Sequence, residues 1–200
     1  MKKAVFTAFC LSVFVGLLSL VSVADASTGP AAQLQKTVSD IQKVIGGAPT
    51  ITEAQKSAVR QLIFERIDMA DVSRRTLGKH YAAHKDRFPE FVRLFGGLIE
   101  KNWMNRASGI AGAKIEFERE RLDGDLATVE SKLVMGRGGE ISVGFRLHRA
   151  GNQWLVHDIL VEGISLVSSY RAQFNRVIQQ DSFDELISRL RAKDLGEETK

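Results

Sequence analysis

A histidine beside an aspartate is the first feature of this 200-residue chain that could do chemistry. His157 and Asp158 precede Ser165, and the three are the residue types of a nucleophilic triad. Adjacent residues of a strand point to opposite faces, so this spacing argues against a triad. A lipid hydrolase that uses His157 and Ser165 therefore stays open only as the weaker alternative.

Two further histidines lie one helical turn apart if their segment is helical. His80 and His84 could then bind zinc together. The zinc-protease pattern requires a glutamate after the first histidine, where this chain has Tyr81. We interpret both histidines as surface residues and expect neither a metal nor another cofactor.

The segment 162–165 joins a predicted strand to a predicted helix. Ser165 is a natural N-cap, and the free amides beside it could hold a phosphate. Arg171 and Arg176 on the following helix could contact an anionic headgroup. An ordinary helix cap and solvated arginines explain the same residues, and we favour that interpretation for Ser165.

The N-terminal residues have the pattern of a secretory leader. Lys2 and Lys3 precede an apolar run over 4–24, and a small-residue triplet at 24–26 predicts cleavage after residue 26. The run is long enough that an uncleaved membrane anchor is the alternative. Cleavage removes Cys10 and leaves 174 residues of net charge +3, without cysteine. Disulfides are then excluded, and the weak, interspersed charge indicates no nucleic-acid partner.

Helical periodicity predicts four helices in the first half of the remaining chain. They cover 30–47, a segment that begins at a capping box on Thr50 or Thr52, then 69–77 and 88–103. The last has the largest apolar face. Its members are Phe88, Phe91, Val92, Phe95, Leu98, Ile99 and Trp103.

At residue 113 the period changes to two, and four alternating runs predict an antiparallel meander. A three-residue loop at 136–138 keeps Leu133 and Val143 on one face. In the fourth run, alternation places Trp154 and Val156 on the face of the third strand's apolar residues. Leu155, Ile159 and Val161 would then point to the other side, which makes this strand apolar on both faces. Asp158 would share the face of Trp154 and Val156.

Helical periodicity returns over 166–178 and again after Ser182, and a polar tail covers 194–200. The order of elements predicts an α+β fold, with helices packed on a twisted four-stranded antiparallel sheet. Residues 27–193 are expected to form one domain. Periodicity alone does not distinguish a filled core from a lined cavity.

Two segments resemble the MlaC-type, or toluene-tolerance, family of periplasmic phospholipid-binding proteins. Residues 67–81 and 88–103 resemble its first half. Residues 154–167, followed by Tyr-Arg-x-Gln-Phe at 170–174, are similar to its W-x-v-x-D-v-x-v-E-G-v-S-l-v motif. The family's usual Thr-Pro-x-x-Arg before the long helix is replaced by 84–87, and the glycine of its final Gly-x-x-Leu helix is absent. The resemblance covers roughly residues 32–193.

The resemblance implies a periplasmic carrier and not an enzyme. Such a carrier shuttles phospholipids between the outer and inner membranes, as the soluble component of an ABC-transporter system that maintains outer-membrane lipid asymmetry. The implied partners are a phospholipid, an outer-membrane lipoprotein complex and an inner-membrane ABC-transporter complex. A carrier of a related lipid such as a hopanoid, and a structural adaptor of a transporter, stay open as alternatives.

The resemblance also implies an apolar pocket between helices and sheet. Asp158 in the motif should have a hydrogen-bond partner if it is buried. We expect the long helix to face the sheet across the pocket. Together with the predicted faces, this gives the expected lipid-binding residues, namely Phe95, Leu98, Ile99, Trp103, Val129, Leu133, Val143, Phe145, Val156, Ile164, Val167 and Tyr170.

Overall fold

The computed structural model describes residues 29–46, 51–107, 113–135 and 139–192; the predicted leader (1–26) and polar tail (194–200) lie outside these ranges. Along the chain, one group of helices precedes the strands of an antiparallel sheet and a second group follows them, which confirms the α+β class. The elements are α1 (Pro30–Ile45), α2 (Glu53–Phe64), α3 (Met69–Leu77), the 3-10 segment η2 (Gly78–Arg87), α4 (Phe88–Ala107), β1 (Lys114–Asp123), β2 (Leu126–Val134), β3 (Glu140–Ala150), β4 (Gln153–Val161), β5 (Ile164–Ser165), α5 (Leu166–Gln180) and α6 (Phe183–Ala192).

Local capping explains where the first helices begin and end. Thr52, and not Thr50, caps α2 through a complete capping box with Gln55. Asp68 caps α3 by accepting a hydrogen bond from the amide of Asp71. Gly46 ends α1 in the left-handed region, at φ 63°. Among the described residues, none of the helices has the length and apolarity needed to cross a membrane.

The four predicted strands form the predicted meander, but the sheet has five strands in the order β1-β2-β3-β4-β5, because the two residues of β5 pair with the end of β4 after the turn at 162–163. Leu133 lies opposite Ile141, and Ser131 lies opposite Val143. Facing residues share one side of a sheet, so Leu133 and Val143 lie on the same face, as predicted.

The prediction for the second half of β4 is wrong, because the strand contains a bulge. Leu147 pairs with Val156, but the preceding Arg146 pairs with Asp158, so His157 is an extra residue. One extra residue reverses the alternation beyond it. Ile159 therefore lies opposite Phe145 and shares its face, and Asp158 moves to the face of Arg146.

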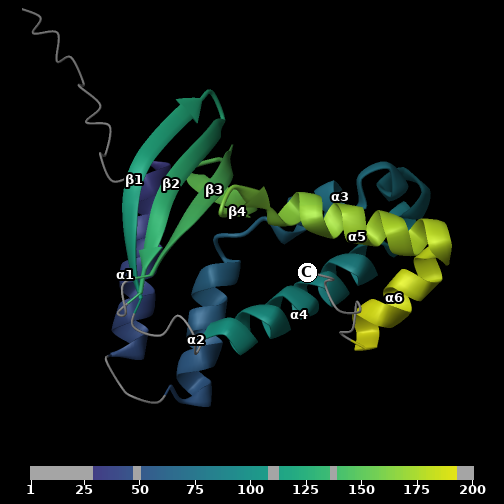
Figure 1. The fold of residues 1–200 in the computed structure, drawn as a ribbon, viewed down its shortest axis with the longest axis horizontal. Helices are drawn as coiled ribbons and strands as arrows, with labels where there is room; N and C mark the ends of the chain where they lie inside the picture. Colours follow the sequence, from purple (N-terminus) through teal and green to yellow (C-terminus); the bar gives the residue numbers. More distant parts are fainter. Residues whose placement is uncertain (1–28, 47–50, 108–112, 136–138, 193–200) are drawn as a thin grey trace, which may run out of the picture.

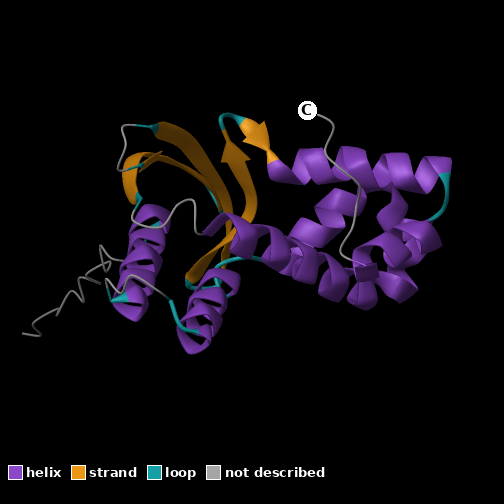
Figure 2. Cartoon of the chain, turned by 60° about the horizontal axis from the view of Figure 1, so that its bottom comes forward, coloured by secondary structure: helices purple, strands orange, loops and turns teal. Residues whose placement is uncertain are grey.

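Helix α1 covers the apolar face of the sheet. Figure 1 shows α1 beside β1 and β2, and Figure 2 shows it beneath the sheet. Gln33 fixes α1 to the β3–β4 turn, because its Oε1 accepts from the Trp154 amide at 3.0 Å and its Nε2 donates to the Asn152 carbonyl at 3.2 Å. The buried members of this sheet cluster are Leu34, Ala127, Val129, Leu147, Trp154 and Val156.

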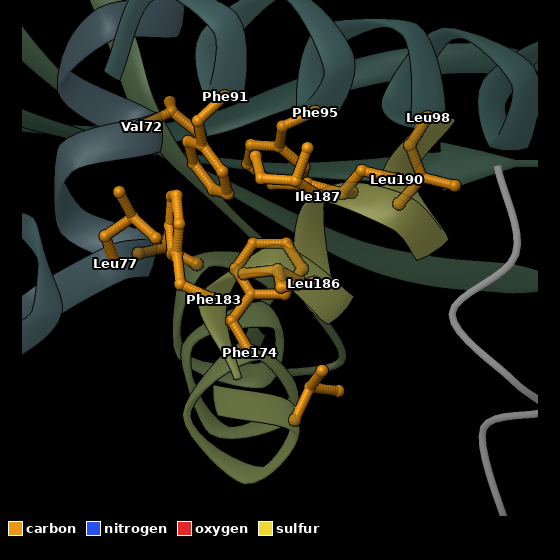
Figure 3. Close-up of a cluster of buried hydrophobic side chains, with 12 residues drawn as sticks. Val72, Leu77, Phe91, Phe95, Leu98, Phe174, Phe183, Leu186, Ile187 and Leu190 are labelled. Carbon is orange, nitrogen blue, oxygen red and sulfur yellow. The ribbon is translucent and has the colours of Figure 1, made fainter. Parts of the chain in front are cut away.

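A second apolar cluster lies among helices α3 to α6, which form the other end of the molecule (Figure 1). Phe91 and Phe95 point from α4 toward Phe174 of α5 and Phe183 of α6 (Figure 3). Phe91, Phe95 and Phe174 are completely buried, and the burial of the first two, with that of Leu98, confirms the apolar face predicted for the long helix. The members of this helix cluster are Val72, Leu77, Phe91, Phe95, Leu98, Val167, Phe174, Val177, Phe183, Leu186, Ile187 and Leu190.

The segment between α2 and α3 joins the two clusters. Ile67 forms an isolated parallel bridge with Val156 of β4 and packs against both clusters. The Val156 amide donates to the Arg66 carbonyl at 2.7 Å, and the Asp68 amide donates to the Val156 carbonyl at 3.0 Å. These bonds fix the start of α3 against the middle of β4.

Candidate functional site

An apolar pocket opens where β4 meets helices α3, α4 and α5. Its cavity volume is about 60 Å³ in this structure. The polar groups of its wall are the Thr76 hydroxyl, the Asp158 carboxylate and the Tyr170 hydroxyl. The lining residues are Ile67, Met69, Val72, Thr76, Phe95, Ile99, Val156, Asp158, Ile159, Leu166, Val167 and Tyr170.

Five of the residues predicted to bind lipid line this pocket: Phe95, Ile99, Val156, Val167 and Tyr170. Three different parts of the chain supply them, namely α4, β4 and the first turns of α5. The tertiary structure therefore brings together a subset of the predicted residues that are far apart in the sequence.

The other predicted residues lie elsewhere. Leu98 is buried in the helix cluster, and Val129 is buried in the sheet cluster, against which Phe145 packs. The expectation that the long helix faces these strands is wrong, because α1 covers them. Three more do not line the pocket, since Leu133 and Val143 are half-buried and Ile164 is 64% exposed elsewhere on the molecule. The side chain of Trp103 lies outside the described residues.

Helix α3 supplies pocket residues that the sequence prediction missed. Met69, Val72 and Thr76 follow each other at spacings of three and four, so they share one face of α3. That spacing could have identified this face of α3 from the sequence. Ile159 was missed for a different reason. The bulge in β4 places it on the face of Phe145, and the apolar pattern of the strand does not indicate a bulge.

Asp158 is the most buried charged group of the pocket wall, with 5% of its surface exposed. Its Oδ2 accepts from the Ser165 hydroxyl at 2.7 Å and from Nη1 of Arg146 at 3.2 Å. Its Oδ1 accepts from the Val167 amide at 3.1 Å. The expectation of a hydrogen-bond partner is confirmed, and the carboxylate acts as a second cap on α5.

These bonds bear on the two alternatives raised for Ser165. Its hydroxyl donates to Asp158 and accepts from the Ser168 amide at 3.0 Å. The hydroxyl proton is thus directed at the Asp158 carboxylate. A nucleophilic triad would require it to be directed at His157. The amides of Val167 and Ser168 already have acceptors, which favours the ordinary helix cap over a phosphate site.

Three of the other candidate polar residues, His80, His84 and Arg171, also have structural partners, whereas Arg176 is exposed. His80 hydrogen-bonds Oδ1 of Asn175 at 2.9 Å, whereas the His84 ring stacks on Phe183 at 3.9 Å between centroids. The two histidines therefore have separate contacts. In the part of the chain that the structure describes, no group of three metal-ligating side chains is found. Nε of Arg171 donates to the Arg75 carbonyl at 2.7 Å and so helps to join α5 to α3.

His157, the bulge residue, is buried with 8% of its surface exposed, and its Nδ1 has no hydrogen-bond partner among the residues that the structure describes. Its ring stacks on His148 at 5.7 Å between centroids. Burial lowers its pKa below the usual value, and the positive charge of Arg75 lowers it further; His148 acts in the same direction, while Asp71 and Asp158 oppose the shift. We therefore expect a neutral imidazole at neutral pH.

This pKa shift predicts how stability depends on pH. The pKa of His157 is lowered in the folded state and is about 6.5 in the unfolded state. At pH values between these two, His157 binds more protons in the unfolded chain than in the folded one. The free energy of unfolding should then fall as the pH drops from 7.5 to 5.5. In His157→Gln this fall should be smaller, as measured by urea unfolding at each pH. An unchanged pH dependence in the variant would contradict the prediction.

The antiparallel sheet covered by α1, the separate group of helices α3–α6 and the apolar pocket where β4 meets that group define an α+β protein with a pocket between sheet and helices. The chain belongs to the MlaC protein family, whose model matches residues 33–192. This confirms the family resemblance seen in the sequence.

Two relatives extend this comparison. The intermembrane phospholipid transport system binding protein MlaC of Haemophilus influenzae is 23% identical over 193 residues, which cover 91% of this chain and 90% of that protein. The structure of a phospholipid-binding protein from Ralstonia solanacearum, in complex with a phospholipid, superposes with a TM-score of 0.71. It is 20% identical, and the match covers 82% of this chain and 96% of the other. At that identity the likeness concerns the fold.

Proposed function

We propose that this protein is a periplasmic phospholipid carrier that binds acyl chains in the pocket between β4, α3, α4 and α5. The apolar lining of that pocket is the observation that carries the proposal. The family membership and the phospholipid bound to the Ralstonia solanacearum protein support the same ligand class.

The physical need for a carrier follows from the hydrophobic effect. Exposing two acyl chains of about sixteen carbons to water costs on the order of 20 kcal/mol, at about 0.8 kcal/mol per methylene. A phospholipid therefore crosses an aqueous compartment only if its chains are covered. A pocket with apolar walls and an open mouth covers the chains and leaves the charged headgroup in water.

The finer role follows from the relatives and not from the pocket. We propose that the carrier exchanges lipid with an outer-membrane lipoprotein complex and an inner-membrane ABC-transporter complex, and so maintains outer-membrane lipid asymmetry. The name of the Haemophilus influenzae relative, an intermembrane phospholipid transport system binding protein, supports this role. A hopanoid would suit the same apolar walls, and the lipid extracted from the native host distinguishes the two ligands.

Native mass spectrometry of the protein purified from a bacterial periplasm tests the proposal. We expect a mass increment that corresponds to phospholipid, with the lipid identified by extraction and tandem mass spectrometry. The control is the same protein delipidated and then incubated with phosphatidylethanolamine vesicles, which should restore the increment. Protein that is empty after purification and takes up no lipid from the vesicles would refute the carrier function.

A further inference from the structure

The first turns of α5 form a wall of the pocket, whereas its second half lies in the core. Leu166, Val167 and Tyr170 line the pocket. Phe174 and Val177, one and two turns further along, are 0% and 4% exposed in the helix cluster. The position of the second half is therefore fixed by packing, whereas the first turns both contact the helix cluster, through Val167 and Tyr170, and form the part of α5 that lines the pocket.

The chain just before this wall is fixed at a turn. Glu162 and Gly163 both have positive φ, at 50° and 77°. The Glu162 backbone amide donates to the Ser142 carbonyl at 2.9 Å. Oε1 of the Glu162 side chain accepts from the Ser142 amide at 2.5 Å. The segment 164–170 thus connects a turn fixed to β3 with a helix fixed in the core.

Polar contacts hold this segment against two neighbouring walls of the pocket. From β4, Asp158 accepts from the Ser165 hydroxyl and from the Val167 amide. From α4, Nδ2 of Asn102 donates to the Tyr170 hydroxyl at 3.2 Å. We call these three hydrogen bonds the α5 latch.

Asp158 is the central group of the latch. The carboxylate lies at the N-terminus of α5, where the helix dipole favours a negative charge. It is almost completely buried, so its removal would leave the Ser165 hydroxyl and the Val167 amide short of acceptors. The β4–β5 pairing at Ser165 and the hydrogen bond from Arg171 to Arg75 hold the two ends of this segment, and the latch holds Val167 and Tyr170 between them.

We propose that Asp158 is a positioning residue whose latch holds the first turns of α5 against the pocket and sets the rate at which bound lipid leaves. This inference rests on the proposed carrier function. Breaking the latch opens the α5 wall while the core packing of Phe174 and Val177 keeps the helix in place. The lipid then leaves faster, and the fold is retained.

The experiment measures release of a fluorescent phospholipid from the loaded protein to vesicles of phosphatidylethanolamine and phosphatidylglycerol. We expect Asp158→Asn to release lipid about tenfold faster than wild type, because the amide NH2 that replaces one carboxylate oxygen cannot accept a hydrogen bond and the negative charge at the helix N-terminus is lost. Tyr170→Phe keeps the ring and removes only the hydroxyl, and it should release lipid about threefold faster.

The matched control is Asp181→Asn at the other end of α5. Asp181 pairs with Nη2 of Arg189 at 3.0 Å and does not line the pocket. This variant loses a carboxylate and an ion pair on the same helix, and its release rate should stay within twofold of wild type. Equal acceleration in Asp158→Asn and Asp181→Asn would overturn the proposal, because general destabilisation would then explain both.

A second pair of variants keeps the test decisive if Asp158→Asn does not fold. Ser165→Ala removes the hydroxyl that donates to Asp158, and it should speed release. Ser165→Thr retains a hydroxyl, and it should restore the wild-type rate. If folded Ser165→Ala and Tyr170→Phe both release lipid at the wild-type rate, the latch is refuted and the carrier function stands. Wild-type protein that loads no lipid refutes both.

Discussion

Ile99→Trp is expected to reduce the phospholipid that copurifies with the protein more than tenfold. Ile99 lines the pocket from α4. An indole in its place occupies the space of about three methylenes, which corresponds to about 2.4 kcal/mol of binding free energy. Lipid extracted from equal amounts of protein and quantified by mass spectrometry measures the effect.

Ile178→Trp provides the matched control. Ile178 packs against the helix cluster from α5 but does not line the pocket. The same substitution there should cost stability through overpacking, about 1–3 kcal/mol, and leave the lipid content near that of wild type. Equal lipid in wild type and Ile99→Trp, both folded by circular dichroism, would show that the pocket is not the binding site.

Phe174→Ala is expected to have the largest effect on stability. Phe174 is completely buried, and its ring contacts Phe95 edge-on at 5.0 Å and Phe91 at 5.5 Å between centroids. Truncation removes these contacts and leaves a cavity, which should lower the free energy of unfolding by about 3–5 kcal/mol. Urea unfolding measures the loss, and Tm should fall by roughly 10 °C.

The control for this prediction is Leu126→Ala at the β1–β2 hairpin. Leu126 is also a large apolar residue, but it is 50% exposed. Its truncation should change the free energy of unfolding by less than about 0.5 kcal/mol. A loss below 1 kcal/mol in Phe174→Ala would mean that the helix cluster is not tightly packed around this ring.

Much of the local structure could be predicted from the sequence, because its causes are local. The 3.6-residue period and the glycine after it predicted α3 over 69–77, and the structure has it at Met69–Leu77. The capping box at Thr52 and the apolar face of the long helix are further examples. Each depends on residues within one or two turns of each other, so a single chain segment contains the whole signal.

The register of β2 with β3 was also accessible from the sequence, whereas a register shift between Phe117 and Arg119 in β1 and the bulge in β4 were not predicted. A one-residue slip would move every apolar side chain to the opposite face, so the pattern determines the pairing of β2 with β3. The bulge at His157 cannot be predicted in this way, because β4 is apolar on both faces and a change of face leaves its apolar pattern unaltered. Alternation therefore placed Ile159 and Asp158 on the wrong faces.

The tertiary structure alone decided which of the apolar residues that leave water also line a pocket. Leu98 and Ile99 are neighbours on one predicted face, yet Leu98 is buried in the helix cluster and Ile99 lines the pocket. Val129 was equally apolar, but α1 covers it. Periodicity predicts that a side chain is buried. The residues that it contacts once buried depend on how distant segments pack, and the sequence determinants of that packing are spread over the whole chain.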